Sequence, residues 1–231
     1  MLFRRFQIAL RRAVAKWRAH RTGRINLASV PPCYWVAAGL TSASVVIDCG
    51  TGPDADFSQA IIAKFGSLCH GLEPTRKHHE SLDRIAAKSG GRFDYVARAL
   101  AVMGPRLTFH ESMSNVSGSI LKDHVNVRRD LIVHYEVDTV TIDDLFALFG
   151  LERIHLLKLD IEGAEYALLE HTNRDTLERI DQLVVEFHDH CVPQLSPRDT
   201  RRIIRRLERA GFTSYSVDAI NYLFFRPTSP S

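Results

Sequence analysis

The sequence contains no long apolar run and few cysteines. No apolar run approaches the roughly 20 residues of a membrane-spanning helix, and the apolar core of a secretory signal is also missing. The four cysteines form no Cys-x-x-Cys pair and stand at Cys33, Cys49, Cys69 and Cys191. Cys49 and Cys69 fall in apolar segments, as reduced core thiols do. These absences argue against a membrane-spanning or disulfide-stabilised protein and predict a reducing, cytoplasmic location.

Acidic residues are absent from the first 24 positions, which hold eight basic residues. Because the net charge of the whole chain is +3, the remainder carries −5 and is not expected to bind nucleic acid in general. Residues 2–19 fit an amphipathic helix whose apolar stripe consists of Phe3, Phe6, Leu10, Val14 and Trp17. We predict a peripheral contact of residues 1–24 with the inner face of a membrane. Docking on the protein itself or on a second subunit, or a targeting role, is the competing interpretation.

Length and composition indicate one soluble globular domain with an appendage. The chain has 231 residues, of which 45% are hydrophobic and 25% are charged. We expect a basic helix and linker over residues 1–32, with the linker itself at residues 22–32, and a single domain over residues 33–231. Residues 33–40, which include two aromatic side chains, are expected to cover one end of a cleft in that domain.

Residues 44–74 hold the most informative local pattern in the chain. The β-branched run at residues 45–47 suits a strand that is buried on both faces. Gly50 and Gly52 interrupt the run and allow a tight turn with a close approach of backbone. Apolar residues then recur at helical spacing over residues 57–65, which predicts a helix.

A second strand is predicted over residues 68–72, and Glu73 follows at its tip. Strand, turn, helix and strand in this order form a unit that binds an adenosine-containing cofactor, with the acidic residue holding the ribose hydroxyls. The sequence therefore predicts such a cofactor, held by the glycine turn and by Glu73.

The charges near the turn favour S-adenosylmethionine over NAD. The glycine spacing from Gly50 to Ala55 formally fits the dinucleotide fingerprint as well. However, Asp48, Asp54 and Asp56 surround the turn, which has no Lys or Arg. A pyrophosphate would meet like charges at close range. S-adenosylmethionine has no phosphate and carries a sulfonium and an ammonium, so carboxylates suit it.

Acidic residues also follow a later strand, in the segment over residues 154–165. Its hydrophobic run ends in Asp160 and Glu162. In open α/β sheets the ligand lies outside the carboxyl ends of the strands. We therefore expect Asp160 to face the same cleft as Asp48 and Glu73.

Further segments are expected around this cleft. A strand over residues 181–187 brings His188 to the same edge, and two antiparallel strands over residues 212–225 close the sheet. Residues 93–102 are expected to form the third strand. The hydroxyl-rich loop over residues 112–119 suits a wall of a substrate site.

A divalent cation is possible but not expected at this edge. The groups able to converge there as oxygen and nitrogen ligands are Asp160, Glu186 or His188, and Asp189. A zinc site is less favoured because the usual ligand spacing is missing from the set that would form it, His188, His190 and Cys191.

From about Val45 to Arg226 the sequence resembles the FkbM-type methyltransferases, a branch of the S-adenosylmethionine-dependent class I fold. The most specific motifs are Thr141-Ile-Asp-Asp-Leu and Leu157-Lys-Leu-Asp-Ile-Glu-Gly-Ala-Glu. Glu73-Pro74 and Val184-Val-Glu-Phe-His also match. The resemblance implies an α/β fold with a mostly parallel, Rossmann-like sheet that an antiparallel hairpin closes.

The resemblance also implies a reaction and a set of residues. Members of the family methylate hydroxyl groups, so a hydroxyl of a sugar, a glycan-like compound or another small molecule is the expected acceptor. The residues implied at the donor are Asp48, Gly50, Gly52 and Glu73, with Asp160 and Glu162 near the reaction centre. One departure is Pro53 with its flanking acids, where the family pattern usually has Asn and a further Gly. In the family pattern, the residues at this departure are expected to contact the methionine end of the donor.

Methyl transfer from a sulfonium is an in-line displacement in which the protein aligns the acceptor oxygen and removes its proton. Because an aliphatic hydroxyl is a poor nucleophile, a base is expected. Asp160 and His188 are the candidates, with Glu162 beside them, and His188 has the better ordinary pKa. The alternatives are an NAD-dependent oxidoreductase and a non-catalytic membrane-surface protein that retains the fold. The complete set of Asp48, Glu73 and Asp160 argues against the latter.

Overall fold

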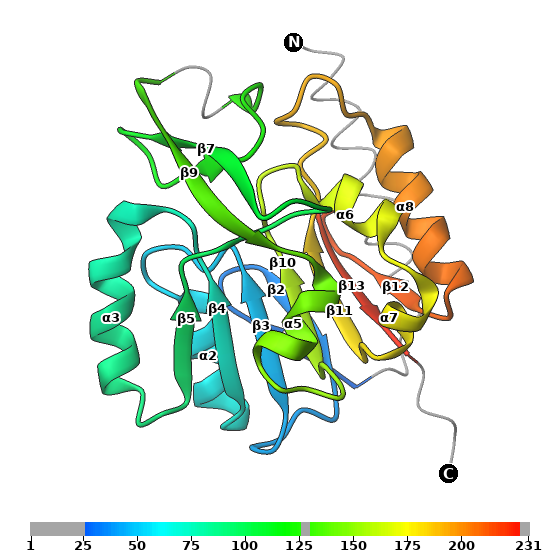
Figure 1. The fold of residues 1–231 in the computed structure, drawn as a ribbon. Helices are drawn as coiled ribbons and strands as arrows, with labels where there is room; N and C mark the ends of the chain where they lie inside the picture. The colour runs from blue at the N-terminus through cyan, green and yellow to red at the C-terminus, as the bar shows by residue number, and fades with distance from the viewer. Residues whose placement is uncertain (1–25, 126–129, 227–231) are drawn as a thin grey trace.

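A computed structural model describes residues 26–125 and 130–226 of the chain (Figure 1). The amphipathic helix expected over residues 2–19 lies outside the described residues, and so does its expected contact with a membrane. None of the helices in the described part is long and apolar enough to cross a bilayer.

A seven-stranded sheet forms the centre of the fold (Figure 1). Its spatial order is β12-β13-β11-β10-β3-β4-β5. The strands are β3 (Val45–Cys49), β4 (Leu68–Leu72), β5 (Phe93–Val96), β10 (Leu156–Leu159), β11 (Gln182–Glu186), β12 (Thr213–Tyr215) and β13 (Asn221–Phe225). Neighbouring strands are parallel except that β13 runs antiparallel to both β11 and β12. The predicted mostly parallel sheet and its closing antiparallel hairpin are thus confirmed.

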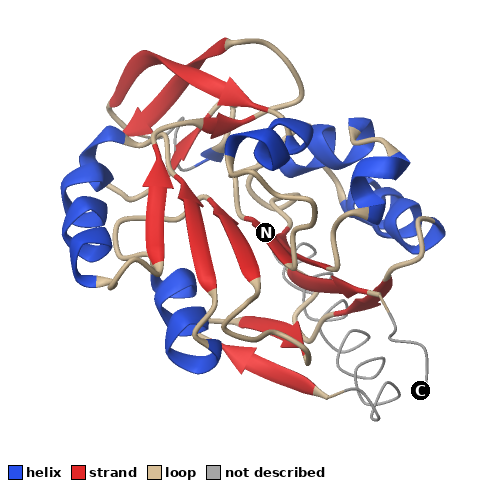
Figure 2. Ribbon diagram, turned by 60° about the horizontal axis from the view of Figure 1, so that its bottom comes forward, coloured by secondary structure: helices blue, strands red, loops and turns tan. Residues whose placement is uncertain are grey.

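Helices lie on both sides of this sheet (Figure 2). Alternate residues of β3 and β10 point to opposite faces, so Ile47 and Leu157 belong to one core and Val46 and Leu156 to the other. The first core is covered by α5 (Ile142–Leu148), α6 (Glu165–His171), α7 (Arg174–Glu178) and α8 (Pro197–Arg209). The second is covered by α2 (Asp56–Phe65), by α3 (His79–Lys88) after the 3-10 turn η1 (Arg76–His78), and by an N-terminal hairpin.

The N-terminal hairpin corrects one expectation. Strands β1 (Leu27–Val30) and β2 (Tyr34–Ala37) pair antiparallel, so the linker expected over residues 22–32 is wrong for the residues of β1. The backbone N–H of Ala37 donates to Gln182 Oε1 at 2.8 Å, and Gln182 Nε2 donates back to the Ala37 carbonyl at 3.2 Å. These two bonds fasten the hairpin to β11 and place the start of β2 beside the carboxyl edge of the sheet.

A smaller sheet lies above that edge in the view of Figure 1. Its order is β6-β9-β7-β8, with β6 (Ala99–Leu100), β7 (Arg106–Ser112), β8 (Gly118–Ser119) and β9 (Ile132–Val140). The third strand expected over residues 93–102 is therefore divided, because β5 ends at Val96 and β6 pairs with β9 instead. The loop expected over residues 112–119 ends in β8, which pairs with β7.

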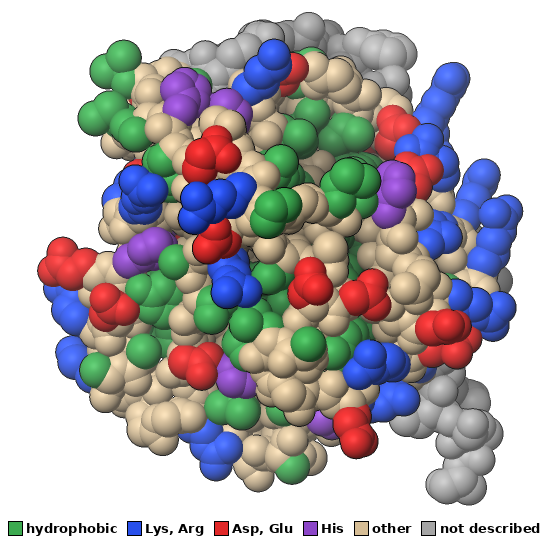
Figure 3. Space-filling view, viewed as in Figure 1, with side chains coloured by type: hydrophobic (Ala, Val, Ile, Leu, Met, Phe, Trp, Pro, Cys, Tyr) green, Lys and Arg blue, Asp and Glu red, His purple; other side chains and the backbone are tan. Residues whose placement is uncertain are grey.

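Helix α8 carries a basic outer face. Thr200, Ile203 and Leu207 are buried beneath it. Blue side chains gather along the same edge of the molecule in the space-filling view (Figure 3), and the exposed arginines of the helix are Arg198, Arg201, Arg202, Arg205 and Arg209. Helix α8 is therefore amphipathic, with an apolar side on the core and a basic side in solvent.

We expect Gly50→Ala to destabilise the protein far more than Gly90→Ala. Both glycines have a positive φ, +78° and +63°, which costs an alanine about 1–2 kcal/mol. Only at Gly50 would the new Cβ collide with backbone, 1.8 Å from the Asp160 carbonyl oxygen, whereas nothing lies within 4 Å at Gly90. Urea unfolding should show a loss of about 3 kcal/mol or more for Gly50→Ala, because overpacking adds to the φ cost. Equal losses would contradict the close approach of the turn to β10.

Candidate active site

A pocket opens at the carboxyl ends of β3, β4 and β10, beneath the smaller sheet. The predicted residues that line it are Gly50, Gly52, Glu73, Asp160 and Glu162. The rest of its wall includes Thr75, Arg98, Leu100, Phe109, Gly118 and Ser119. The structure therefore brings together five of the seven predicted site residues, and the loop over residues 112–119 supplies part of the wall as expected.

Glu73 fixes the glycine turn against the end of β4. Its side chain is buried, and Oε2 accepts a hydrogen bond from the Gly52 N–H at 2.7 Å. Oε1 accepts from the Thr75 N–H at 2.9 Å, and His78 Nδ1 lies 3.6 Å from Oε2. Burial acts to raise the pKa of Glu73, but His78 and the hydrogen bonds of Thr75 outweigh it and hold this pKa below its usual range. The carboxylate thus lies charged at the pocket wall, where a hydroxyl group can donate to it.

Asp48 occupies a different place from the one expected. Its side chain is fully buried and does not line the pocket, so the expectation that it faces the cleft is wrong. The Ser58 hydroxyl donates to Oδ2 at 2.7 Å, and Lys158 Nζ lies 3.1 Å from Oδ1. The alternation of side chains along β3 directs Asp48 to the face of the sheet that α2 covers, whereas the backbone turn that follows it faces the pocket.

Lys158 joins Asp48 to the pocket. Its ammonium donates to the Gly50 carbonyl at 3.0 Å and lies 3.4 Å from Asp160 Oδ2. Burial would lower the pKa of Lys158, but the carboxylates of Asp48 and Asp160 outweigh this and raise it above its ordinary value. A charged lysine in the sheet therefore fixes both the glycine turn and the acid that follows β10.

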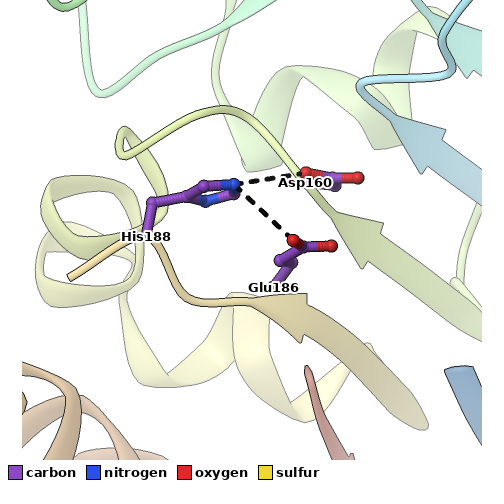
Figure 4. A group of neighbouring side chains, drawn as sticks. All are labelled: Asp160, Glu186 and His188. Atoms are coloured by element: carbon purple, nitrogen blue, oxygen red, sulfur yellow. Dashed lines mark ion pairs between the residues drawn. The ribbon is translucent and has the colours of Figure 1, made fainter. Parts of the chain in front are cut away.

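His188 lies at the centre of a group of carboxylates. Its side chain is buried, and Nδ1 lies 3.0 Å from Glu165 Oε1. Nε2 lies 3.7 Å from Asp160 Oδ1, 3.7 Å from Glu162 Oε2 and 3.9 Å from Glu186 Oε1. Figure 4 shows the imidazole turned toward Asp160 and Glu186. The prediction that His188 shares the edge of the sheet with Asp160 and Glu162 is confirmed.

Tyr34 covers this group from β2, as expected for residues 33–40. Its hydroxyl lies 3.0 Å from both Asp160 Oδ2 and Glu186 Oε2. Tyr34 does not line the pocket beside Glu73 but a neighbouring hollow, whose lining shares Gly50, Gly52 and Asp160 with that pocket. Sequence reasoning anticipated the cover but not the contact, because the two acids stand more than a hundred positions away.

The electrostatics of the group differ from those of free side chains. Burial would lower the pKa of His188, but Glu165, Asp160 and Glu162 outweigh it and raise this pKa well above its usual value. Burial and the neighbouring Asp160 raise the pKa of Glu186 to about 7. From the sequence, Glu186 was considered only as a possible metal ligand. Its position at the end of β11, two residues before His188, could have placed it at the same edge of the sheet.

Further polar side chains surround the group. His124 Nε2 lies 2.8 Å from Glu162 Oε2, a contact for which the sequence offered no signal. Asp189 accepts a hydrogen bond from the Thr200 hydroxyl at 2.6 Å. Within the described ranges, the residues whose ligand atoms lie close enough to share a metal ion are Asp160, Glu186 and His188. Asp189 is not part of that group. Of the residues considered for a zinc site, only His188 belongs to it, whereas His190 and Cys191 do not.

Both the sequence and the fold match known proteins. A family model described as the methyltransferase FkbM domain matches residues 48–214. The chain is similar in structure to a fibrillarin pre-rRNA processing protein of Methanococcus jannaschii, at 9% identity, 87% coverage of this chain, 70% of that chain and a TM-score of 0.49. An rRNA methylase from Streptococcus thermophilus gives 9% identity, coverages of 82% and 90%, and a TM-score of 0.45. No match was found among curated protein sequences.

We expect Lys158→Met to destabilise the fold by about 3–5 kcal/mol, because it leaves the buried carboxylate of Asp48 without its cation. Denaturant unfolding followed by circular dichroism measures the loss. Lys88→Met, at an exposed position of α3, is the control and should stay within about 0.5 kcal/mol of wild type.

The double variant Asp48→Asn with Lys158→Met should recover part of the stability, since the unpaired charge is then gone. A double variant less stable than Lys158→Met alone would show that the ion pair is not the cause of the loss.

Proposed function

The chain belongs to the methyltransferase FkbM domain family and is an S-adenosylmethionine-dependent methyltransferase; we propose that its acceptor is a hydroxyl oxygen of a sugar or glycan-like compound. One observation carries the proposal. Asp160 lines the donor pocket and also belongs to the group of carboxylates around His188. A donor in the pocket would therefore place its reactive methyl group beside side chains able to bind and deprotonate a hydroxyl.

The residues of the pocket fit the donor. S-adenosylmethionine supplies an electrophilic methyl group on a positively charged sulfonium. Glu73 presents a buried carboxylate for ribose hydroxyls, and the turn at Gly50 and Gly52 leaves backbone in the wall, where a side chain would project. Asp160 and Glu162 add negative charge to the wall, which suits a cationic donor.

The acceptor side is built for proton removal. A hydroxyl group needs an acceptor for its hydrogen bond and a base for its proton, because an unassisted aliphatic hydroxyl is a poor nucleophile. Asp160 and Glu162 offer both within one small group, and His188, whose pKa is raised well above its usual value, lies beside them as their cation. Several carboxylates side by side also suit a compound with neighbouring hydroxyls, such as a sugar, since each oxygen accepts one hydrogen bond.

The function is tested by titration followed by a product screen. Isothermal titration of the full chain with S-adenosylmethionine, NAD and nucleotide sugars should give binding of the first alone. Incubation with candidate glycans and the donor should then give a methyl-sized mass increment. The increment should be absent when the hydroxyl groups of the acceptor are chemically blocked beforehand. An increment that persists on an acceptor without free hydroxyls would overturn the assignment to oxygen.

We expect Glu73→Gln to weaken S-adenosylmethionine binding by about 1–3 kcal/mol, the range of hydrogen bonds to a charged group. Isothermal titration measures the affinity. Glu111→Gln is a matched control, because Glu111 is also buried and also accepts from a backbone N–H, that of Arg76 at 3.1 Å, but lies outside the pocket wall. Equal donor affinity in folded Glu73→Gln and wild type would remove Glu73 from the donor site.

We expect His188→Ala to lower kcat by about 10²–10⁴, the range for loss of proton transfer, because the imidazole lies 3.7 Å from both Asp160 and Glu162, the carboxylates that handle the reacting proton. Donor affinity should change little. Formation of S-adenosylhomocysteine with an acceptor found in the screen measures the rate. His171→Ala, at an exposed position of α6, is the control. Near-normal turnover of His188→Ala across a pH series would exclude His188 from the chemistry.

A further inference from the structure

The group around His188 leaves a gap that hydrogen bonds do not fill. Nε2 faces the oxygens of Asp160, Glu162 and Glu186 at 3.7, 3.7 and 3.9 Å. In a hydrogen bond the nitrogen and oxygen atoms are usually no more than about 3.2 Å apart. The ring cannot easily turn to shorten one contact, because Glu165 Oε1 lies 3.0 Å from Nδ1 and also accepts from the His188 backbone N–H at 2.9 Å. The ring is therefore held with Nε2 directed into a space bounded by oxygens.

The two acids at this space are held in the same way. The Tyr34 hydroxyl lies 3.0 Å from Asp160 Oδ2 and from Glu186 Oε2. In both residues the other oxygen is the one that faces Nε2. Tyr34 has one hydroxyl proton, so it cannot donate fully to both carboxylates. The outer oxygens are thus anchored, and the inner ones remain turned toward the gap.

The charges around the gap do not balance. Asp48, Asp160, Glu162, Glu165 and Glu186 lie in one connected group. Among residues 26–125 and 130–226, the bases in contact with these acids are Lys158, His124 and His188. When all five carboxylates are ionised, the three bases, even if all are protonated, leave two negative charges without a partner in a largely buried place. Buried charge of one sign is costly unless a counter-ion compensates it.

From these contacts we propose that Asp160, Glu186 and His188 bind one divalent cation between β10 and β11. Their ligand atoms all lie within 4.8 Å of one another, close enough to share an ion, and Figure 4 shows them converging. Two carboxylates with one imidazole form a mixed oxygen and nitrogen set, which suits Mn²⁺ better than the all-oxygen shells of Mg²⁺ and Ca²⁺. The Glu165 contact on Nδ1 is the usual outer support of a metal-binding histidine.

The role of the cation rests on the proposed function, whereas its binding rests on the side chains alone. Since Asp160 and Glu162 also line the donor pocket, an acceptor hydroxyl bound to the ion would lie next to the methyl group. Coordination lowers the pKa of the hydroxyl, and its proton passes to the carboxylate of Glu162. The new C–O bond forms as the C–S bond breaks, and the electron pair of the C–S bond returns to sulfur.

Binding of Mn²⁺ alone tests the site. The full-length chain, stripped with EDTA and dialysed, should bind one Mn²⁺ per chain by electron paramagnetic resonance and isothermal titration. Asp160→Asn, Glu186→Gln and His188→Ala should each weaken this binding at least tenfold, and Glu165→Gln about tenfold through the orientation of the ring. Circular dichroism establishes that each variant is folded.

Asp189→Asn is the matched control. Asp189 is a buried carboxylate that directly follows His188 in the chain, but its Oδ2 accepts from Thr200. Its Mn²⁺ affinity should equal that of wild type. Absence of stoichiometric Mn²⁺ binding, or wild-type affinity in the three ligand variants, overturns the site. Tighter binding of Mg²⁺ than of Mn²⁺ overturns the assignment of His188 as a ligand.

Donor titration separates this inference from the proposed function. S-adenosylmethionine binding without any Mn²⁺ binding would overturn the metal site and leave the methyltransferase proposal in place. Mn²⁺ binding to Asp160, Glu186 and His188, together with failure to methylate any hydroxyl compound, would support the site and overturn the hydroxyl acceptor. Methyl transfer that is lost with EDTA and restored by Mn²⁺ in wild type supports both.

Discussion

The buried ammonium of Lys158 is the contact on which both halves of the site depend. It stands on β10 between the carboxylates of Asp48 and Asp160 and donates to the Gly50 carbonyl. One cation thereby joins β3, the glycine turn in the pocket wall and the acid that follows β10. Because an isolated charge in the sheet would be costly, each of these groups holds the others in place. The lysine in an otherwise apolar strand is therefore a structural part of the active site.

The donor half of the site was predictable because local rules determine it. Alternation, glycine turns and helical spacing over residues 44–74 fix strand, turn and helix in sequence, and the carboxyl ends of parallel strands share an edge. Gly50, Gly52, Glu73, Asp160 and Glu162 consequently meet where the sequence predicted. The closing hairpin followed from the family resemblance in the same way.

The remaining features depend on contacts that no local pattern records. Asp48 was placed at the cleft because it lies at the end of a strand beside the glycine turn, yet its side chain lies beneath α2, beside Lys158 of the neighbouring strand. Strand β1 was read as a linker, since four residues without clear alternation become a strand only through pairing with β2. The contact of Tyr34 with Asp160 and Glu186 joins segments far apart in the chain. Such contacts arise from packing of the whole domain.

The preference for a cationic donor survives these corrections, but for a different reason. In the sequence it rested on three acids around the glycine turn, of which Asp48 is neutralised by Lys158 while Asp54 and Asp56 are exposed. In the structure the negative charge comes instead from Asp160 and Glu186 at the ends of β10 and β11, whose carboxylates the Tyr34 hydroxyl contacts. A pyrophosphate would meet this surplus directly, whereas a sulfonium reduces it. Under the proposed function, the same surplus that favours a cationic donor also provides the place for a cation beside the acceptor, so that donor choice and acceptor activation would follow from one arrangement of charge.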